Sequence, residues 1–203
     1  KPIDIKKLET ASILLMPWIN MQVNDERTLG KGLAMMHKVS SRADKKQFGW
    51  GENGFIGSGT QPKGFRDNWG ECFVDLRLKP QLKIAEKWGL DINKYSKMLP
   101  KLSDFLDSHN PYPSIVHGDL WKGNVGIHTN GKGVIFDPAV WWADREVDLA
   151  MTHLFGGFKK EFYEGYEEIW PLPKSQFLRI EIYNLYHLLN HANIFGGSYI
   201  NQC

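Results

Sequence analysis

The sequence lacks the features that mark several classes of protein. Its 203 residues contain only two cysteines, Cys72 and Cys203, which are too few for a disulfide framework, and we expect both to be free thiols. No stretch reaches the roughly 18 apolar residues of a membrane span, and the charged N-terminus does not match a signal peptide. The net charge is only +2, and no run of five Lys or Arg residues occurs, which argues against a nucleic-acid partner. We therefore expect a globular protein of the cytoplasm.

The composition fits one globular domain with both kinds of secondary structure. Hydrophobic residues make up 42% of the chain, and 203 residues are enough to bury a sizeable core. A short buried strand is expected at Ile13-Leu14-Leu15-Met16, and an ordered loop at 47–66, which is rich in Gly, Asn, Ser and Pro. Apolar spacing predicts helices over 24–38 (with Asn24 as N-cap), 67–80, 82–88, 91–106, 148–152 and 175–193, the last with Leu178, Ile182, Leu185 and Leu189 facing inward. The expected fold class is α+β, mostly helical.

One segment carries most of the chemical information. His117-Gly118-Asp119-Leu120-Trp121-Lys122-Gly123-Asn124 places an Asn five residues after an Asp, and Phe136-Asp137-Pro138 supplies a second Asp. This is the spacing of the protein-kinase pattern H-R-D-x-x-x-x-N followed by D-F-G. Phosphoryl transfer needs oxygen ligands for metal-bound phosphates and a separate carboxylate for the acceptor hydroxyl. The ordered set of polar residues therefore indicates a phosphoryl-transfer site.

A catalytic β-hairpin is predicted to bring two of these residues together. Two short strands flank Asn130-Gly131, a dipeptide typical of two-residue hairpin turns. With that turn, Asn124 lies directly opposite Asp137, with Cβ atoms roughly 5 Å apart, which is close enough to share a metal ion. A longer loop with Gly133 in a bulge would shift the register by one residue. Alternatively, the two residues merely cap the hairpin, which leaves the His-Gly-Asp segment unexplained.

Several further blocks extend the pattern from about residue 13 to residue 199. They are Phe55-Ile56-Gly57-Ser58 with Gln61-Pro62, Arg77-Leu78-Lys79-Pro80-Gln81-Leu82, the segment from Asp144 to Met151, Leu154-Phe155-Gly156-Gly157-Phe158, the segment from Tyr186 to His191, and Phe195-Gly196-Gly197-Ser198-Tyr199. Together with the His-Gly-Asp segment, they resemble the fructosamine (ketosamine) kinase family, within the aminoglycoside/choline-kinase and protein-kinase-like superfamily. Aminoglycoside and choline kinases share only the looser His-Gly-Asp and Asp pattern.

The resemblance implies a specific reaction. Members of this family use ATP to phosphorylate the 3-hydroxyl of a fructosamine, the adduct formed when glucose glycates an amine, often on a lysine. The product is unstable and breaks down, which frees the amine. By this resemblance Asp119 orients and deprotonates the hydroxyl, and Asn124 and Asp137 hold Mg²⁺ on the ATP phosphates.

Supporting roles follow for residues near the motif. Trp121 is expected to stack on the sugar, unless it packs beneath the loop, and Trp142 and Asp144 are expected in the acceptor pocket. His117 is expected to hold the catalytic loop, and Asp148, at a helix start, to brace it.

Other positions have plainer interpretations. Gly118 and Pro138 replace residues that switch protein kinases between states, which fits a constitutively formed small-molecule kinase. Lys122 is expected to be solvated. His187 and His191 lie at i and i+4 without a third ligand, so we expect helix-packing or pocket residues and no zinc site.

Only one wall of a kinase site is evident in the sequence. Met16, Pro17 and Trp18 match the hinge of the family and would bind the nucleotide at its adenine, but no Gly-rich loop precedes Ile13. We therefore expect residues 1–23 to be a residual hinge segment and 24–203 a kinase-like C-terminal lobe, with the N-terminal nucleotide lobe largely absent by truncation or by nature. Such a chain is expected to catalyse slowly on its own.

Two alternatives remain open. The chain could be a non-catalytic ketosamine-binding half-kinase, in which case Mg²⁺-dependent nucleotide binding would be absent. It could instead phosphorylate another small-molecule hydroxyl, such as that of an aminoglycoside or choline, which a comparison of acceptors would reveal. The expected partners are ATP and a small-molecule or protein-bound ketosamine, with no nucleic acid and no membrane.

Overall fold

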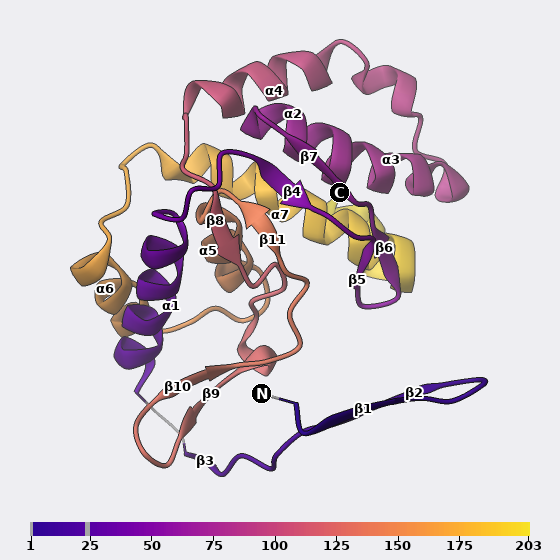
Figure 1. Ribbon diagram of the computed structural model, residues 1–203. Coiled ribbons are helices and arrows are strands. Elements are labelled where there is room, and N and C mark those ends of the chain that lie inside the picture. Colours follow the sequence, from indigo (N-terminus) through magenta and orange to yellow (C-terminus); the bar gives the residue numbers. More distant parts are fainter. Residues whose placement is uncertain (1, 23–24) are drawn as a thin grey trace.

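The computed structural model describes residues 2–22 and 25–203, and in this range helices are combined with small antiparallel sheets (Figure 1). The helices are α1 (Glu26–Ser40), α2 (Trp69–Phe73), α3 (Lys79–Ala85), α4 (Met98–Ser108), α5 (Glu146–Leu154), α6 (Lys160–Ile169) and α7 (Gln176–Phe195). The strands are β1 (Asp4–Lys7), β2 (Ser12–Leu15), β3 (Met21–Gln22), β4 (Phe48–Trp50), β5 (Gly54–Ile56), β6 (Gly59–Gln61), β7 (Gly64–Arg66), β8 (Ser114–Val116), β9 (Val125–His128), β10 (Gly133–Ile135) and β11 (Trp141–Ala143).

The strands form four small sheets. Their orders are β1-β2, β10-β9-β3, β7-β4-β11-β8 and β5-β6, and every pair is antiparallel. Both cysteines are free thiols, as expected. Among the helices of the described residues, none has both the length and the apolar composition that crossing a bilayer requires.

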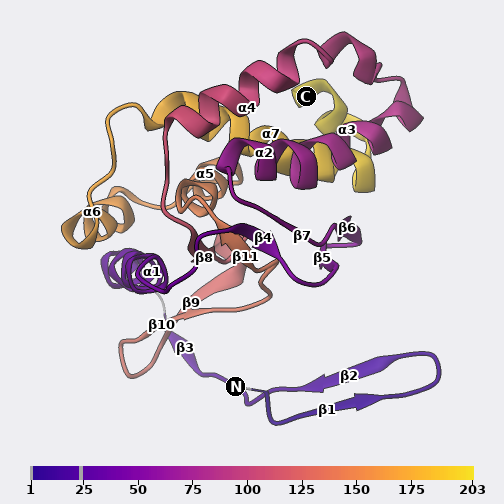
Figure 2. The same cartoon turned by 45° about the horizontal axis from the view of Figure 1, so that its top comes forward.

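Two hydrophobic cores organise these elements. The larger core joins the four-stranded sheet to α2, α3, α4, α5 and α7, and the smaller core joins α1, α6 and β9 through residues such as Leu33 and Phe162. In both views α2, α3, α4 and α7 lie together, while the β1–β2 hairpin projects away from the rest of the chain (Figures 1 and 2). The His-Gly-Asp motif lies between the two cores: Val116, the last residue of β8, belongs to the larger core, and Leu120, between β8 and β9, belongs to the smaller one.

The N-terminal strand prediction is right in type and wrong in burial. Residues Ser12–Leu15 form β2, but Ile13, Leu14 and Leu15 are each about half exposed. Within the described residues their only strand partner is β1 on the same hairpin. An apolar run therefore does not establish burial, because burial also needs a second layer to pack against.

Several helix predictions need correction. Helix α1 has Asp25 as its N-cap, whose carboxylate accepts from Thr28 N at 3.0 Å, while the expected cap Asn24 lies outside the described residues. The stretch 47–66, predicted to be a loop, contains the short strands β4 to β7. The predicted helix over 91–106 divides into a 3₁₀ turn at Ile92–Tyr95 and α4.

Pro80 does not end its helix. Helix α2 continues through a π-helical segment, Val74–Leu78, into α3, with Pro80 in the first turn of α3. The missing N–H of a proline is tolerated in a first turn, and the wider π-helical turn before it allows the chain to continue.

The predicted inward face of α7 is confirmed in part. Leu189 is buried and Ile182 and Leu185 pack against the larger core, but Leu178 is 67% exposed. The buried face also includes Tyr183 and Tyr186. Helix α7 packs on both α5 and α3, so its buried face is wider than a single leucine stripe and includes polar residues.

Helix α6 was not predicted, and it packs closely against α1. A Cβ atom added at Gly30 would lie 1.9 Å from the backbone oxygen of Phe162, and one added at Gly165 would lie 2.2 Å from that of Arg27. The glycines thus allow the two backbones to touch. Ion pairs flank this contact, including Arg27–Glu164 at 2.6 Å.

We expect Gly30→Ala to destabilise the protein by about 1–3 kcal/mol, because the new methyl group forces α1 and α6 apart. Gly32→Ala on the same helix is the matched control, since a Cβ atom there meets nothing within 4 Å. This control should instead stabilise the protein by up to about 1 kcal/mol through helix propensity. Urea unfolding of both variants measures the difference, and equal effects would contradict the close packing of α1 on α6.

Candidate functional site

The β9–β10 hairpin carries one side of the site, and its register differs from the predicted one. Ile127 pairs with Gly133, and Val125 pairs with Ile135. The loop has three residues, with Gly131 at φ +82°, and His128 N donates to Lys132 O at 2.8 Å. A three-residue loop ending in a left-handed residue is a common hairpin connection.

This loop shifts the pairing by one residue, as the longer-loop alternative anticipates, but Gly133 pairs with Ile127 and does not form the expected bulge. Asn124 is not directly opposite Asp137; its carbonyl accepts instead from Phe136 N at 3.1 Å. Asp137 follows with φ +56°, a left-handed conformation that is uncommon for residues other than glycine. Backbone strain of this kind is concentrated at functional sites.

The predicted catalytic loop, residues 117–124, is held by the buried carboxylate of Asp148, in the first turn of α5. One oxygen, Oδ1, accepts from Gly118 N at 2.8 Å. The other, Oδ2, accepts from His117 N at 2.7 Å and lies 3.0 Å from His37 Nε2. The structure thus places Asp148 where the sequence predicts a brace.

Burial raises the pKa of Asp148, but hydrogen bonds from His37 and Gly118 and the charges of His37 and His117 outweigh it. The pKa of this carboxyl therefore lies below its ordinary value of 3.8.

His117 and Gly118 fix the shape of the loop. His117 Nε2 donates to Phe136 O at 2.8 Å, and its Nδ1 accepts from Asp119 N at 3.3 Å, so the imidazole links the loop to the end of β10. Gly118 has φ +81°, and a Cβ atom there would lie 2.2 Å from Ala139 O. Since no side chain fits at this position, the Arg of the protein-kinase pattern is excluded on steric grounds.

Four of the predicted site residues line one pocket of about 470 Å³: Asp119, Trp121, Asn124 and Asp137. The side-chain nitrogen of Asn124 donates to Asp119 O at 2.9 Å, so its amide orientation is fixed and its oxygen stays available as a ligand. Trp121 has 42% of its surface exposed.

The carboxylate of Asp119 has the electrostatics of a base. Burial raises its pKa above the ordinary 3.8, as do the charges of Asp137 and Asp148, against the opposing charges of His117 and His191. A raised pKa strengthens a carboxylate as a proton acceptor, provided that it remains ionised at the working pH.

The pocket lining also includes His191, which the sequence analysis expected to be a helix-packing or pocket residue, and further residues to which it assigned no role. Helix α7 contributes Asn190, His191 and Phe195, and the segments after α5 and α7 contribute Phe155 and Tyr199. All five residues lie in sequence blocks that carry the family resemblance, at 154–158, 186–191 and 195–199, and two of these blocks contain the tripeptide Phe-Gly-Gly.

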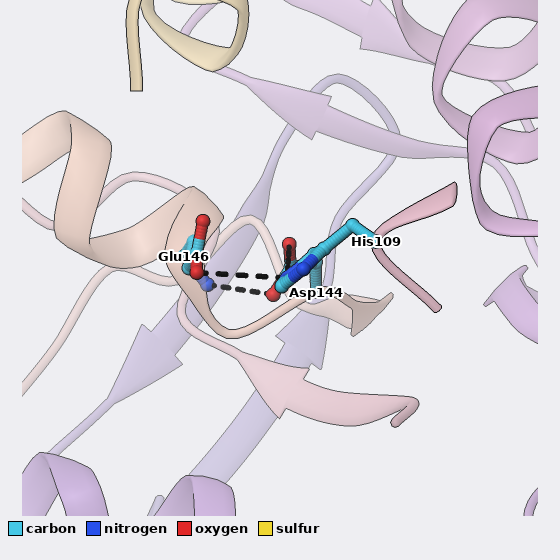
Figure 3. Close-up of side chains that lie close together, drawn as sticks. All are labelled: His109, Asp144 and Glu146. Carbon is cyan, nitrogen blue, oxygen red and sulfur yellow. Dashed lines mark hydrogen bonds and ion pairs between the residues drawn. The ribbon is translucent and has the colours of Figure 1, made fainter. Parts of the chain in front are cut away.

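Asp144 and Trp142 are not among the residues that line this pocket. Asp144 is buried and accepts from Tyr183 OH at 2.7 Å. Figure 3 shows His109 pointing toward Asp144 and Glu146, with His109 Nε2 at 3.3 Å and 3.5 Å from their carboxylate oxygens. Trp142 sits in the middle of β11, paired with Ile115.

The His109–Asp144–Glu146 cluster is an ion-pair network. Arg179 donates to both oxygens of Glu146, at 2.7 Å and 2.9 Å, so a metal ion there would face a guanidinium charge. Burial and the charge of Asp144 raise the pKa of Glu146, opposed by Arg179 and His109. The cluster ties α4, α5 and α7 together, which is a structural role.

Met16, Pro17 and Trp18, the predicted nucleotide contacts, lie between β2 and β3. They are not part of the pocket wall, and Met16 and Trp18 are 57% and 90% exposed. Trp18 Nε1 donates to Asn20 Oδ1 at 3.0 Å. Strand β3 pairs with β9, which brings this segment to the same small sheet as the hairpin (Figure 1).

The donor set in the pocket fits a divalent cation of the magnesium type. Asn124 and Asp137 offer oxygen ligands, which hard cations prefer, and both side chains open into the same space. A zinc site would need additional His or Cys ligands, and none joins Asn124 and Asp137 in a ligand cluster among the described residues. In that part of the chain, the only cluster of three possible metal ligands is His109, Asp144 and Glu146.

Comparisons with known proteins agree with this geometry. The family described as fructosamine kinase matches residues 1–203. A protein of Vibrio parahaemolyticus named "Probable ketoamine kinase" is 42% identical over 173 residues, which are 85% of this chain and 59% of that protein. A Synechocystis protein of the same name is 41% identical over 194 residues, 94% of this chain and 65% of that protein.

Solved structures are similar over nearly the whole chain. A crystal structure from Haemophilus somnus, named "Putative fructosamine-3-kinase", has a TM-score of 0.84 at 30% identity and covers 99% of this chain and 71% of that one. A protein of the same name from Thermobifida fusca has a TM-score of 0.81 at 29% identity, with 99% and 70% covered. The chain spans only 59% to 65% of the length of the curated relatives cited above.

The brace predicts a dependence of stability on pH. Because the folded pKa of Asp148 is lowered, its carboxylate contributes stability that is fully present above the unfolded pKa of about 3.9 and is lost as the pH falls through the folded pKa. Asp148→Asn should cost about 3–5 kcal/mol at pH 7, as expected when one partner of a buried charged network is removed. It should also flatten the fall in stability below about pH 4.

Guanidinium unfolding from pH 3 to pH 7 measures both effects. Asp104→Asn, at an exposed carboxylate of α4, is the control for the loss of one charge. Identical pH profiles for the two variants would contradict the assigned role of Asp148.

Proposed function

This chain belongs to the fructosamine kinase family, and we propose that it carries the acceptor-binding and catalytic part of an ATP-dependent kinase for ketosamines. The observation that carries the proposal is the convergence of Asp119, Asn124 and Asp137 on one pocket. One carboxylate is then available for the acceptor hydroxyl, while an amide and a second carboxylate remain for a metal ion.

Asp119 is the proposed base. It accepts the proton of the sugar 3-hydroxyl as that oxygen attacks the γ-phosphorus of ATP, while the bond from phosphorus to the β,γ-bridging oxygen breaks and ADP leaves. Its position is fixed through its own backbone, since Asp119 N donates to His117 and its carbonyl accepts from Asn124. Fixed positioning is the main contribution that a protein makes to phosphoryl transfer.

Asn124 and Asp137 are the proposed magnesium ligands. When bound there, magnesium would neutralise charge on the phosphate oxygens. The nucleotide is proposed to approach from the side of β3 and β9, where residues 1–23 present Met16, Pro17 and Trp18 for contact with the adenine. In this proposal residues 24–203 supply the acceptor site.

The acceptor is proposed to be a ketosamine, bound as the free molecule or on a protein. Trp121 lines the pocket and offers a flat face for the sugar ring. Its exposure of 42% leaves part of that face accessible to a ligand. Release of the phosphorylated product, followed by its breakdown, would regenerate the free amine.

Asp119→Asn should lower the rate of phosphoryl transfer by about 10²- to 10⁴-fold, because the amide cannot accept the proton. The assay follows labelled phosphate from Mg·ATP to 1-butylamino-1-deoxyfructose, with Asp104→Asn as the control for charge. Transfer by the wild-type chain no faster than by the Asp119 variant would count against the proposal.

Asp137→Asn should behave differently, because it weakens metal binding and leaves the base intact. Its rate should recover in part as Mg²⁺ is raised tenfold or more, whereas the rate of the Asp119 variant should not. Rates measured across a magnesium series make the comparison. If both variants respond alike to magnesium, the two carboxylates do not have separate roles.

A further inference from the structure

Four aromatic rings surround one end of the site pocket, and the proposed chemistry uses none of them. His191 is central: its ring centroid lies 4.5 Å from that of Phe155, 5.7 Å from that of Phe195 and 5.3 Å from that of Tyr199. Phe155 and Tyr199 are 6.3 Å apart in a T-shaped arrangement, and Phe195 and Tyr199 are 6.1 Å apart. All four residues line the pocket that contains Asp119. We call them the aromatic cluster.

The cluster is built from the ends of two helices that pack together. Phe155 directly follows α5, and Phe195 is the last residue of α7; each is followed by two glycines. Because α5 packs along α7, the two Phe-Gly-Gly segments meet beside the pocket. Neither phenylalanine is needed for the larger hydrophobic core, which contains neither of them.

The charged side chains that line the pocket favour a cationic ligand. Two carboxylates, those of Asp119 and Asp137, line it, and within the described part of the chain no Lys or Arg does. His191 Nδ1 donates to His187 O at 2.8 Å, which fixes the orientation of its ring. Carboxylates and the negative faces of aromatic rings both attract cations.

We infer that the aromatic cluster binds the protonated amine of the acceptor, so that the site selects cationic amino sugars over neutral ones. This inference rests on the proposed function and adds the chemical group by which the substrate is recognised. The sugar hydroxyl lies at Asp119, and the ammonium group and its substituent lie against Phe155, His191, Phe195 and Tyr199.

The exposure of the aromatic cluster determines how large a substituent the bound amine can carry. Phe195 is 67% exposed, so the cluster opens toward solvent at the end of α7. A substituent on the amine can therefore leave the pocket, and an amine attached to a larger molecule, such as a lysine side chain of a protein, is accommodated in the same way as a small amine.

Apolar packing alone would give a different selectivity. If the rings served only as an apolar wall, a neutral hydrophobic substituent would bind at least as well as a charged one. A cation–π contact reverses this order, and each good contact changes an affinity by about 2- to 30-fold. The test therefore needs two ligands of equal shape and different charge.

The two probes are 1-deoxy-1-trimethylammoniofructose, which keeps its charge at every pH, and its neutral isostere with a tert-butyl carbon in place of the ammonium group. Calorimetric titration of this chain at pH 8 measures both affinities. The wild-type chain should prefer the cation by about tenfold. Phe155→Leu and Phe195→Leu should each weaken binding of the cation about three- to tenfold and change binding of the isostere less than about twofold.

Two control variants distinguish the effect of losing an aromatic ring from a general effect on the fold. Phe195→Tyr keeps an aromatic face and should retain the preference for the cation, and Phe177→Leu, at an exposed position of α7, should change neither affinity. Circular dichroism checks that each variant is folded, and the exposed Phe195 provides a variant that tolerates substitution if Phe155→Leu does not fold.

Each outcome bears on the inference. Equal binding of the two probes by the wild-type chain, equal loss of both in the Leu variants, or no binding of either probe would overturn it. A preference for the cation that depends on the rings supports it, even if the chain transfers no phosphate to an amino sugar. A lack of phosphate transfer would count against the proposed function and not against this inference.

Discussion

The buried carboxylate of Asp148 is the interaction on which the rest of the site depends. It accepts two consecutive backbone N–H groups of the catalytic loop, from His117 and Gly118, and lies 3.0 Å from His37 Nε2. His37 in turn lies 2.8 Å from the hydroxyl of Tyr166 on α6. The loop is thus connected through buried hydrogen bonds to α1, α5 and α6. Networks of this kind are rigid when every member is satisfied and costly when one is removed.

Helix α5 also links the loop to the aromatic cluster. Its first turn carries Asp148, which holds the loop, and Phe155 follows directly after its last residue. Between these two points α5 packs on α7, which ends with Phe195. The distance between Asp119 and the cluster is therefore set by two packed helices. A rigid arrangement of this kind favours positioning over induced fit, in agreement with the proposed mechanism, in which placement of the reactants dominates.

Much of the catalytic loop could be predicted from the sequence because its residues carry chemistry at fixed spacing. The hairpin register could not be predicted, because the same sequence is compatible with a two-residue and a three-residue loop. The structure has the three-residue loop, with Gly131 at positive φ. The strands β4 to β7 were missed because each has only three residues and owes its stability to tertiary pairing. The prediction of Asp144 in the acceptor pocket is not supported by the pocket lining, because its contacts with Tyr183 and His109 come from distant segments that no local pattern reveals.

The most direct test of this account is hydrogen exchange of the backbone amides of His117 and Gly118, followed residue by residue by NMR. If the carboxylate of Asp148 holds the loop as described, both amides exchange as slowly as those in the middle of α5 and α7, through global unfolding. The exposed hairpin loop at Gly131 should exchange far faster. Exchange of His117 and Gly118 at the rate of Gly131 would contradict the account, because the loop would then open without unfolding of the protein.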